Sequence, residues 1–357
     1  MKTYIKFLSL IFIKSFFYVV ATMLSLVFIL NTLSELEFFK EIEIGIEFTL
    51  FLSLLNSPSM IFEMFPFIFL ISTQFFFIKL FNNNELEVFK YSGLKNSSIL
   101  IFLSAISFVI GVIIITIFYN FSANFKNFYL EKKSQFTSDG KYLAVVTKNG
   151  LWIKDEIDEK IYIINSAEIK NNYLVNNFIT EFNRDFEAIR NVQSKKIDIK
   201  EKKWVIYDAT IYNKNESSFL NILELKTNFD YKRIQTLYSN LSSLNIFQLF
   251  ELRNNYNKLN YSLTDVNLQL IKIFAYPLYM ALITIFTALI MFKIRRQDST
   301  TFKISIGLFI SVIIYYINNF FLVMGSTERI SLIFAVFTPL IVLGMVNSIM
   351  IYKINEK

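Results

Sequence analysis

The chain divides into long apolar runs and one long polar stretch. Three apolar runs come first and three come last, and residues 122–267 between them are much more polar. Each run has about 20 residues or more, which at about 1.5 Å per residue lets a helix cross a hydrocarbon layer about 30 Å thick. We therefore expect an α-helical membrane protein with six transmembrane helices and a domain inserted between helices 3 and 4. The six runs are Tyr4–Leu33, Ile61–Leu80, Ser98–Phe121, Leu270–Phe292, Phe302–Met324 and Ile330–Tyr352.

The inserted segment has the period of β-strands. Lys160–Ile164, Lys196–Lys200 and Trp204–Tyr212 alternate in polarity or are rich in β-branched and aromatic residues. Candidate strands recur about every 10–12 residues from Tyr142 to Thr227, which predicts an all-β sandwich, jelly roll or open roll. Turn-forming residues separate the strands, at Ser138-Asp139-Gly140, Lys148-Asn149-Gly150, Asn183-Arg184-Asp185 and Lys200-Glu201-Lys202.

These patterns predict three parts of the chain. Residues 1–121 hold transmembrane helices 1–3, residues 122–267 form a jelly-roll-like all-β domain, and residues 268–357 hold helices 4–6. Within the middle part, residues 231–261 change to a polar helical pattern and predict one or two helices leading into the fourth span.

Basic residues gather on one side of the predicted spans. If the N-terminus is cytoplasmic, the cytoplasmic flanks and loops hold twelve Lys and Arg residues, whereas the short outer loops hold only Lys40 and Arg329. Short loops rich in Lys and Arg stay in the cytoplasm. We expect a multi-pass protein of the bacterial inner membrane with both termini cytoplasmic and the β domain periplasmic. The net charge of +7 largely follows from these loops and needs no nucleic-acid partner.

The composition excludes several classes of enzyme. The chain has no Cys and no His, which removes disulfides, thiolate or imidazole metal sites, Cys nucleophiles and Ser-His-Asp catalysis. Its eight glycines are scattered, and no Gly-rich loop precedes a Lys-Ser/Thr pair to hold the phosphates of ATP. We expect no catalytic residue, metal or cofactor, so the protein is not an enzyme.

Few polar residues interrupt the apolar runs. Lys14 in span one and Glu63 near the outer end of span two either extend to the nearer membrane surface or line a cavity. Span five carries an adjacent polar set, which in lipid must face protein or water and so forms either helix–helix hydrogen bonds or a substrate-facing surface. The set is Tyr315, Tyr316, Asn318 and Asn319.

The loop between spans two and three carries the signals of a capped helix. Asn84 is a good N-cap residue and Gly93 a natural C′ residue, so a short helix is predicted over about 84–93. Leu86 and Phe89 lie three residues apart and share one face of it. Such a helix either docks into a groove on a partner or lies on the membrane surface.

At this loop the chain resembles the LptF/LptG permeases of the lipopolysaccharide-export ABC transporter. Glu85, Leu86, Val88 and Gly93 match the family's short S/N-E-L-x-V-x-x-x-x-G helix. Asn149–Asp155 is similar to the G-L-W-x-K-D strand typical of the LptG branch, so the resemblance leans toward LptG. The layout of three spans, a periplasmic jelly roll and three more spans resembles the family along essentially the whole chain. Three prolines also sit where the family has them, at Pro66, Pro277 and Pro339.

The resemblance implies a permease subunit whose energy comes from another chain. By analogy the loop helix docks on the ATPase subunit LptB, with Glu85 making a polar contact and Leu86, Val88 and Phe89 an apolar one. A second permease, LptF, would pair with this chain, and spans one and five of each would form lateral gates for the lipid. The β domain would pass lipopolysaccharide, or a related glycolipid, to LptC and the periplasmic bridge.

The chain departs from the family pattern at the outer end of span one. LptG proteins often carry lysines there, suited to the phosphates of lipid A, whereas here Lys40 is the one basic residue among the acidic Glu35, Glu37 and Glu41. Lys40 is either part of the substrate cavity or an interfacial anchor. The candidate cavity residues are Lys40, Tyr315, Asn318 and Asn319.

Two other functions fit parts of the sequence. An ATPase-driven mechanotransmission or scaffold protein would carry no substrate, but such proteins commonly have four spans with the large domain after the first. An ion-coupled carrier normally has buried carboxylates and repeat symmetry, and neither is evident here.

Overall fold

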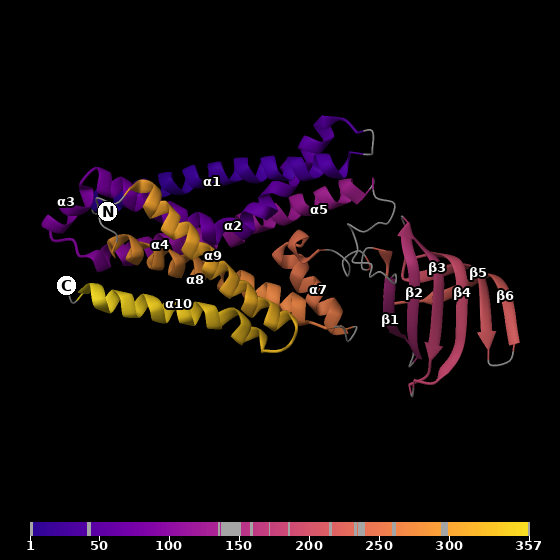
Figure 1. Cartoon of the computed structure of the whole chain (residues 1–357). Coiled ribbons are helices and arrows are strands. Elements are labelled where there is room, and N and C mark those ends of the chain that lie inside the picture. The colour runs from indigo at the N-terminus through magenta and orange to yellow at the C-terminus, as the bar shows by residue number, and fades with distance from the viewer. Residues whose placement is uncertain are drawn as a thin grey trace. The chain divides into compact units, whose positions relative to one another are not determined.

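The computed structural model contains two compact units, one helical and one built around a β-sheet (Figure 1). The helical unit consists of Met1–Lys126 and Thr264–Lys357, and the second unit is Asn127–Leu263. The structure describes residues 3–40, 44–134, 136, 151–157, 160–170, 172–184, 186–213, 216–231, 234, 240–258, 262–293 and 299–355.

Six helices among these residues are long and apolar enough to cross a membrane, which confirms the six predicted spans. They are α1 (Thr3–Phe38), α2 (Ile46–Asn82), a third that runs through α4 (Asn96–Ile113), the π-helix η1 (Ile114–Tyr119) and α5 (Asn120–Ser134), then α8 (Thr264–Lys293), α9 (Thr300–Ser326) and α10 (Leu332–Asn355). The short helix α3 (Glu85–Tyr91) connects α2 to α4. Both chain ends lie near α3 at one end of the helical unit (Figure 1), which we name the α3 end; the opposite end, where the third span leaves and α8 begins, is the β-domain end.

The second span is longer than its apolar run. It begins at Ile46 rather than at the predicted Ile61. The additional turns mix apolar residues with polar ones, and polar groups among them find partners inside the protein. Asn56 donates from Nδ2 to Oδ1 of Asn31 on α1 at 2.9 Å and accepts from Nζ of Lys126 on α5 at 2.6 Å. Because a polar group satisfied between helices tolerates burial, hydropathy alone misplaced this boundary.

A proline in the second span is compensated by a tyrosine from the fourth. Pro66 has no backbone N–H, so the carbonyl of Phe62 lacks its helical donor. The hydroxyl of Tyr276 on α8 donates to that carbonyl at 2.5 Å. One residue further, Pro277 packs so closely on α4 that a Cβ added at Gly111 would lie 2.8 Å from its Cα. These contacts fix α8 against both α2 and α4.

The inserted domain contains a six-stranded antiparallel sheet in sequential order, which confirms the predicted β domain between spans three and four. Its strands are β1 (Leu151–Ile157), β2 (Lys160–Lys170), β3 (Tyr173–Phe182), β4 (Ala188–Asp198), β5 (Lys203–Asn213) and β6 (Glu216–Lys226). The 3₁₀-helix η2 (Leu241–Ser243) and the helix α7 (Ile246–Lys258) follow, within the predicted helical stretch. The turns predicted at 138–140 and 148–150, the strands expected from Tyr142, and Asp185 lie outside the described residues.

The buried face of the sheet changes parity partway along its strands. On β5, Trp204 and Ile206 are buried before Asp208, and Ala209 and Ile211 are buried after it. Side chains alternate between the faces of a strand with a period of two, so one residue must break the alternation for both pairs to point inward. Asp208 does so with a left-handed φ of 52°.

A second left-handed residue lies in the same row of the sheet. Asn176 on β3 has a φ of 53°, and the strand registers place both Asn176 and Asp208 opposite Lys195 on β4. The buried positions of β3 change parity there as well, from Leu174 to Asn177. A row of this kind bends a sheet across its strands, as aligned bulges do.

A buried carboxylate joins the two edges of the sheet. Asp155 on β1 accepts hydrogen bonds from Oγ1 of Thr227 at 2.7 Å and from the N and Nδ2 of Asn228 at 3.0 and 2.8 Å. Thr227 directly continues β6, because its N–H donates to the carbonyl of Lys202 beside it. In a flat sheet, β1 and β6 would be separated by five spacings, or about 24 Å. The sheet is therefore strongly curled.

We expect Asp155→Ala to destabilise the β domain by about 3 kcal/mol, because it leaves buried donors without an acceptor. Both tryptophans of the chain, Trp152 and Trp204, belong to this domain, so the intrinsic fluorescence of the whole protein in detergent reports its unfolding. Asp198→Ala is the control, because that carboxylate accepts a backbone N–H at an exposed turn. Equal unfolding temperatures for the two variants would contradict the role of Asp155.

A second buried carboxylate has two basic partners. Glu181 on β3 lies 2.7 Å from Nζ of Lys160 on β2 and 2.6 Å from Nε of Arg190 on β4. Burial by itself would raise the pKa of Glu181, but the hydrogen bonds and positive charges of the two basic residues outweigh it and hold this pKa below its ordinary value. The pKa of Lys160 is raised by the same hydrogen bond and charge.

Because the pKa of Glu181 is lowered on folding, its ionised form stabilises the domain above the ordinary pKa of 4.5, and this stabilisation is lost as the pH falls through the folded value. We expect Glu181→Gln to lower the unfolding temperature at pH 7 and to reduce the loss of stability on acidification. Glu224→Gln, which breaks an exposed pair with Lys203, is the control. Tryptophan fluorescence between pH 3 and pH 7 measures both effects; parallel pH profiles for Glu181→Gln and the unmodified chain would rule out the assignment.

Candidate functional site

The helix α3 starts from a left-handed residue rather than from the expected extended N-cap. Asn84 precedes the helix with a φ of 59°, and its carbonyl accepts the N–H of Val88 at 3.3 Å. The neighbouring Asn83 donates from Nδ2 to Oε1 of Glu85 at 3.0 Å. The first turn thus gains a side-chain contact from Asn83 and places Glu85 at the start of the helix.

The helix ends at Tyr91, and Gly93 occupies the C′ position of its C-terminal cap. This glycine has a φ of 82°, and the next residue, Leu94, donates its N–H to the carbonyl of Phe89 at 2.9 Å. That bond is the six-to-one contact of a Schellman cap, which requires a left-handed residue at the C′ position. Nothing lies within 4 Å of a Cβ added at Gly93, so its constraint is purely conformational.

The apolar residues of α3 divide between two directions. Leu86 is only 6% exposed, and the ring of Phe89 lies 5.9 Å from that of Phe7 on α1. Val88 and Tyr91 are 59% and 89% exposed. Two of the predicted contact residues therefore attach α3 to its own subunit, whereas Val88 faces outward together with Tyr91, which the sequence motif did not identify.

The predicted cavity residues of span five lie on a surface that the subunit leaves uncovered. On α9, Tyr315 and Asn319 are exposed and Asn318 is half-buried. Lys40 is exposed just beyond the end of α1. The contacts of the described residues do not bring Lys40 together with the three residues of α9.

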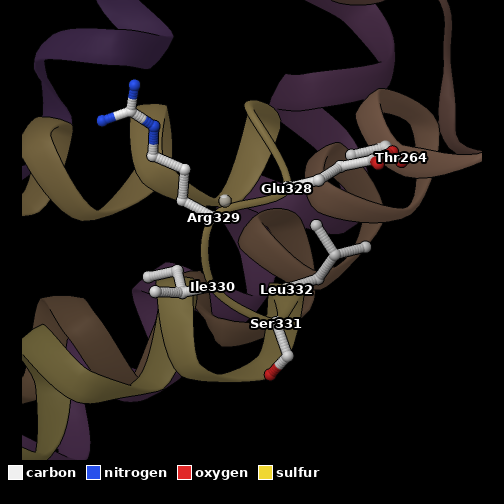
Figure 2. A pocket seen from close by; sticks show the side chains of 7 residues that line it. Thr264, Glu328, Arg329, Ile330, Ser331 and Leu332 are labelled. Atoms are coloured by element: carbon white, nitrogen blue, oxygen red, sulfur yellow. Dashed lines mark hydrogen bonds between the residues drawn. The ribbon is translucent and has the colours of Figure 1, made fainter.

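A pocket of about 370 Å³ lies at the turn between α9 and α10 (Figure 2). Oγ1 of Thr264, at the start of α8, donates to Oε1 of Glu328 at 2.5 Å across it. The guanidinium of Arg329 points away from that pair in Figure 2, so the Glu328 carboxylate is hydrogen-bonded by a neutral hydroxyl rather than paired with this arginine. The lining residues are Thr264, Gly325, Glu328, Arg329, Ile330, Ser331 and Leu332.

Gln74 makes a polar contact between spans that was not predicted from the sequence. Gln74 is the only amide in the predicted run of span two, a signal that could have identified it. It is fully buried, and its Nε2 donates to the backbone carbonyl of Lys303 on α9 at 2.8 Å. Gln74 therefore joins the second span to the fifth near the α3 end.

Comparison with known families identifies the chain as a whole. Over residues 8–353 it matches the family described as lipopolysaccharide export system permease LptF/LptG. The chain belongs to the LptF/LptG family. A search of curated proteins finds no match. The predicted family resemblance is confirmed, and the lean toward the LptG branch stays a prediction because the match covers both branches.

Membership of the LptF/LptG family places the chain among the permease components of an ABC-type lipopolysaccharide exporter. Permeases of this family are not enzymes, and the six apolar helices agree with a multi-pass protein of the inner membrane. Across the described ranges, no three His, Cys, Asp or Glu side chains come together in a way that could hold a metal ion.

The backbone at Gly93 provides a test of the α3 geometry. We expect Gly93→Ala to destabilise the C-terminal turn of α3 by about 1 kcal/mol, because a Cβ is strained at positive φ. Amide hydrogen exchange at Ser92 and Leu94 should become about fivefold faster. Gly45→Ala is the matched control, because Gly45 is also open to a Cβ but has a φ of −63°. Unchanged exchange in Gly93→Ala would contradict the cap.

Proposed function

We propose that this LptF/LptG-family chain is one of two permeases that extract lipopolysaccharide, or a related glycolipid, from the inner membrane and pass it to a periplasmic bridge. ATP hydrolysis takes place on a separate LptB-like subunit. The observation that carries this proposal is the arrangement of α3: its own subunit holds one side of the helix, and the other side is presented for a partner.

The outward side of α3 fits a protein better than a membrane surface. A helix that lies on a membrane turns its apolar face to the lipid. In α3, the residues of that face, Leu86 and Phe89, already contact the subunit. The exposed side mixes Val88 and Tyr91 with the carboxylate of Glu87, as the surface of a docking helix does. We assign the ATPase contact to Val88, Tyr91 and Glu85, with Leu86 and Phe89 transmitting its movement to the spans.

The charge bias of the loops supports a cytoplasmic position for the α3 end. The Lys and Arg residues of the short loops gather there, as they do in cytoplasmic loops generally. Arg295 and Arg296, which contribute to this bias, lie outside the described residues. In this orientation both termini and α3 face the ATPase, and the β domain is periplasmic.

The lipid path follows the two spans that the subunit covers least. In the most apolar window of each span, 28% of α1 and 11% of α9 is buried, the two lowest values among the six. Exposed amides such as Asn319 are costly in hydrocarbon and call for a polar partner. We assign these faces to the second permease and to the headgroup of the lipid, with Tyr315, Asn318 and Lys40 along the path.

The β domain supplies the exit side of this path. Its curled sheet has two edges, β1 and β6, and joins the permease to LptC and the periplasmic bridge by family analogy. The Trp152–Asp155 part of the LptG-like motif lies in β1, whereas Asn149 and Gly150 lie outside the described residues. Asp155 thereby contributes to the closure of the domain that receives the lipid.

Purification of the tagged chain from its own cells tests the proposed assembly. We expect an ATPase subunit and a second six-span permease to co-purify with it, and recovery of neither would overturn the proposal.

Val88→Asp should reduce recovery of the ATPase at least about tenfold, because it buries an unpaired carboxylate in the contact. Glu85→Ala should weaken the same contact. Phe186→Asp, at an equally exposed site between β3 and β4, is the control and should leave recovery unchanged.

Transfer of lipid distinguishes a permease from a mechanotransmission protein. The purified assembly, in vesicles that contain labelled lipopolysaccharide, should release the label to a soluble acceptor only with ATP. Hydrolysis of ATP without release would favour a protein that carries no substrate.

A further inference from the structure

The buried residues of the fifth span form two separate groups. The residues of α9 that the subunit buries are Lys303, Gly307 and Ser311, toward the α3 end, and Gly325, at the β-domain end. From Val312 to Met324 no residue of α9 is buried. The first three are spaced by four residues and form one stripe, so α9 has a single line of attachment at its α3 end.

The attachment at the α3 end is a close polar contact with α2. Gln74 donates from Nε2 to the carbonyl of Lys303 at 2.8 Å, and its amide lies directly over Gly307. A Cβ at Gly307 would overlap the Gln74 amide, so only glycine allows this approach. Nζ of Lys303 lies 5.1 Å from the centre of the Phe81 ring, in the last turns of α2. The contact therefore combines a hydrogen bond, the close approach that Gly307 allows, and a cation–π interaction.

The attachment at the other end is to different helices. A Cβ added at Gly325 would lie 2.5 Å from the Cβ of Ala335 on α10. The same Cβ would lie 3.6 Å from Cδ1 of Leu268 on α8. The two buried groups of α9 thus contact α2 at one end and α10 together with α8 at the other. Because a helix is stiff, any shift of α2 relative to α10 must tilt α9 as a rigid rod.

The contact on α2 lies close to the helix that would receive force. The helix α2 ends at Asn82, and α3 begins at Glu85. We propose that the Gln74–Gly307 contact is the pivot of α9, through which a displacement of α3 is converted into a tilt of the fifth span. The pivot rests on the proposed function, because the ATPase supplies the displacement of α3. Gln74 is a positioning residue, since it acts on the lipid path through α9.

Distance measurements between spin labels in the purified assembly test the pivot. The chain has no native cysteine, so pairs of introduced cysteines label it uniquely. One label at Ile101→Cys on α4 is paired with Phe302→Cys, beside the contact, or with Phe320→Cys, beyond it; all three positions are exposed. Between the nucleotide-free and the ATP–vanadate states, we expect the distances to Phe302 and to Phe320 to change by different amounts, because α9 tilts rather than shifting as a whole. Equal changes at both positions would overturn the pivot.

Two variants remove the contact in different ways. Gly307→Ala forces the Gln74 amide away from α9, and Gln74→Leu keeps a similar volume without the donor. In each, we expect the Phe320 response to be lost and lipid release per ATP to fall about fivefold, while ATP hydrolysis stays within about twofold of the unmodified assembly. Gly344→Ala on α10 is the control, because its Cβ would meet only Leu282 at 4.0 Å. If Gly307→Ala fails to assemble, Gln74→Leu decides the result.

The outcomes separate the pivot from the proposed function. A retained Phe320 response in Gln74→Leu overturns the pivot and leaves the permease assignment intact. If neither label of the unmodified assembly responds to nucleotide while ATP is hydrolysed, both the pivot and the coupling through α3 are overturned. If neither an ATPase nor a second permease co-purifies, the proposed function has already failed.

Discussion

Polar groups inside a hydrocarbon layer must be satisfied by the protein itself, and the packing of the helical unit follows from that constraint. The spans meet at hydrogen bonds that cross between helices rather than at apolar contacts alone. Thr284 on α8 donates to Ser107 on α4 at 2.9 Å, and Asn347 on α10 donates to the carbonyl of Leu282 at 3.0 Å. Since α8 takes part in both, it is the central helix of the unit. The same constraint supports the proposed partner contact on α9, because exposed amides need polar partners in hydrocarbon.

In the β domain, the groups that need partners are the backbone groups at the edges of the sheet, and the sheet brings its edges together by curling. A sheet whose edges stay open exposes unpaired backbone groups along them. Here Asp155 joins β1 to the residues that follow β6, and the left-handed Asn176 and Asp208 bend the sheet so that the join is possible. Two buried carboxylates of this domain find different kinds of partner: Asp155 accepts hydrogen bonds from Thr227 and Asn228, and Glu181 pairs with two basic side chains.

The sequence predicts the parts of this fold that depend on long periodic patterns. Six spans and an inserted β domain follow from hydropathy and alternation, which summed over many residues outweigh local exceptions. The start of α2 at Ile46 could not be predicted, because a polar residue such as Asn56 indicates a solvent-exposed segment unless its partner Asn31 on α1 is known. The α3 motif locates the candidate contact, but which side of the helix is available depends on packing, which buries Leu86. Gln74 is visible only as an isolated amide, and its partner lies 229 residues away along the chain.

The compensation of Pro66 by Tyr276 has a consequence for how the protein is made. The carbonyl of Phe62 in the second span accepts its hydrogen bond from Tyr276 in the fourth. The ribosome makes the whole inserted domain after Phe62 and before Tyr276. The two residues are 214 positions apart, so at about 5–20 residues per second the ribosome needs roughly ten to forty seconds for that interval. During this time the first three spans have no partner for the proline break, so the nascent helices cannot reach their final packing. The packing of the second span is therefore completed only after the fourth has been made, which links the assembly of the two halves of the membrane unit.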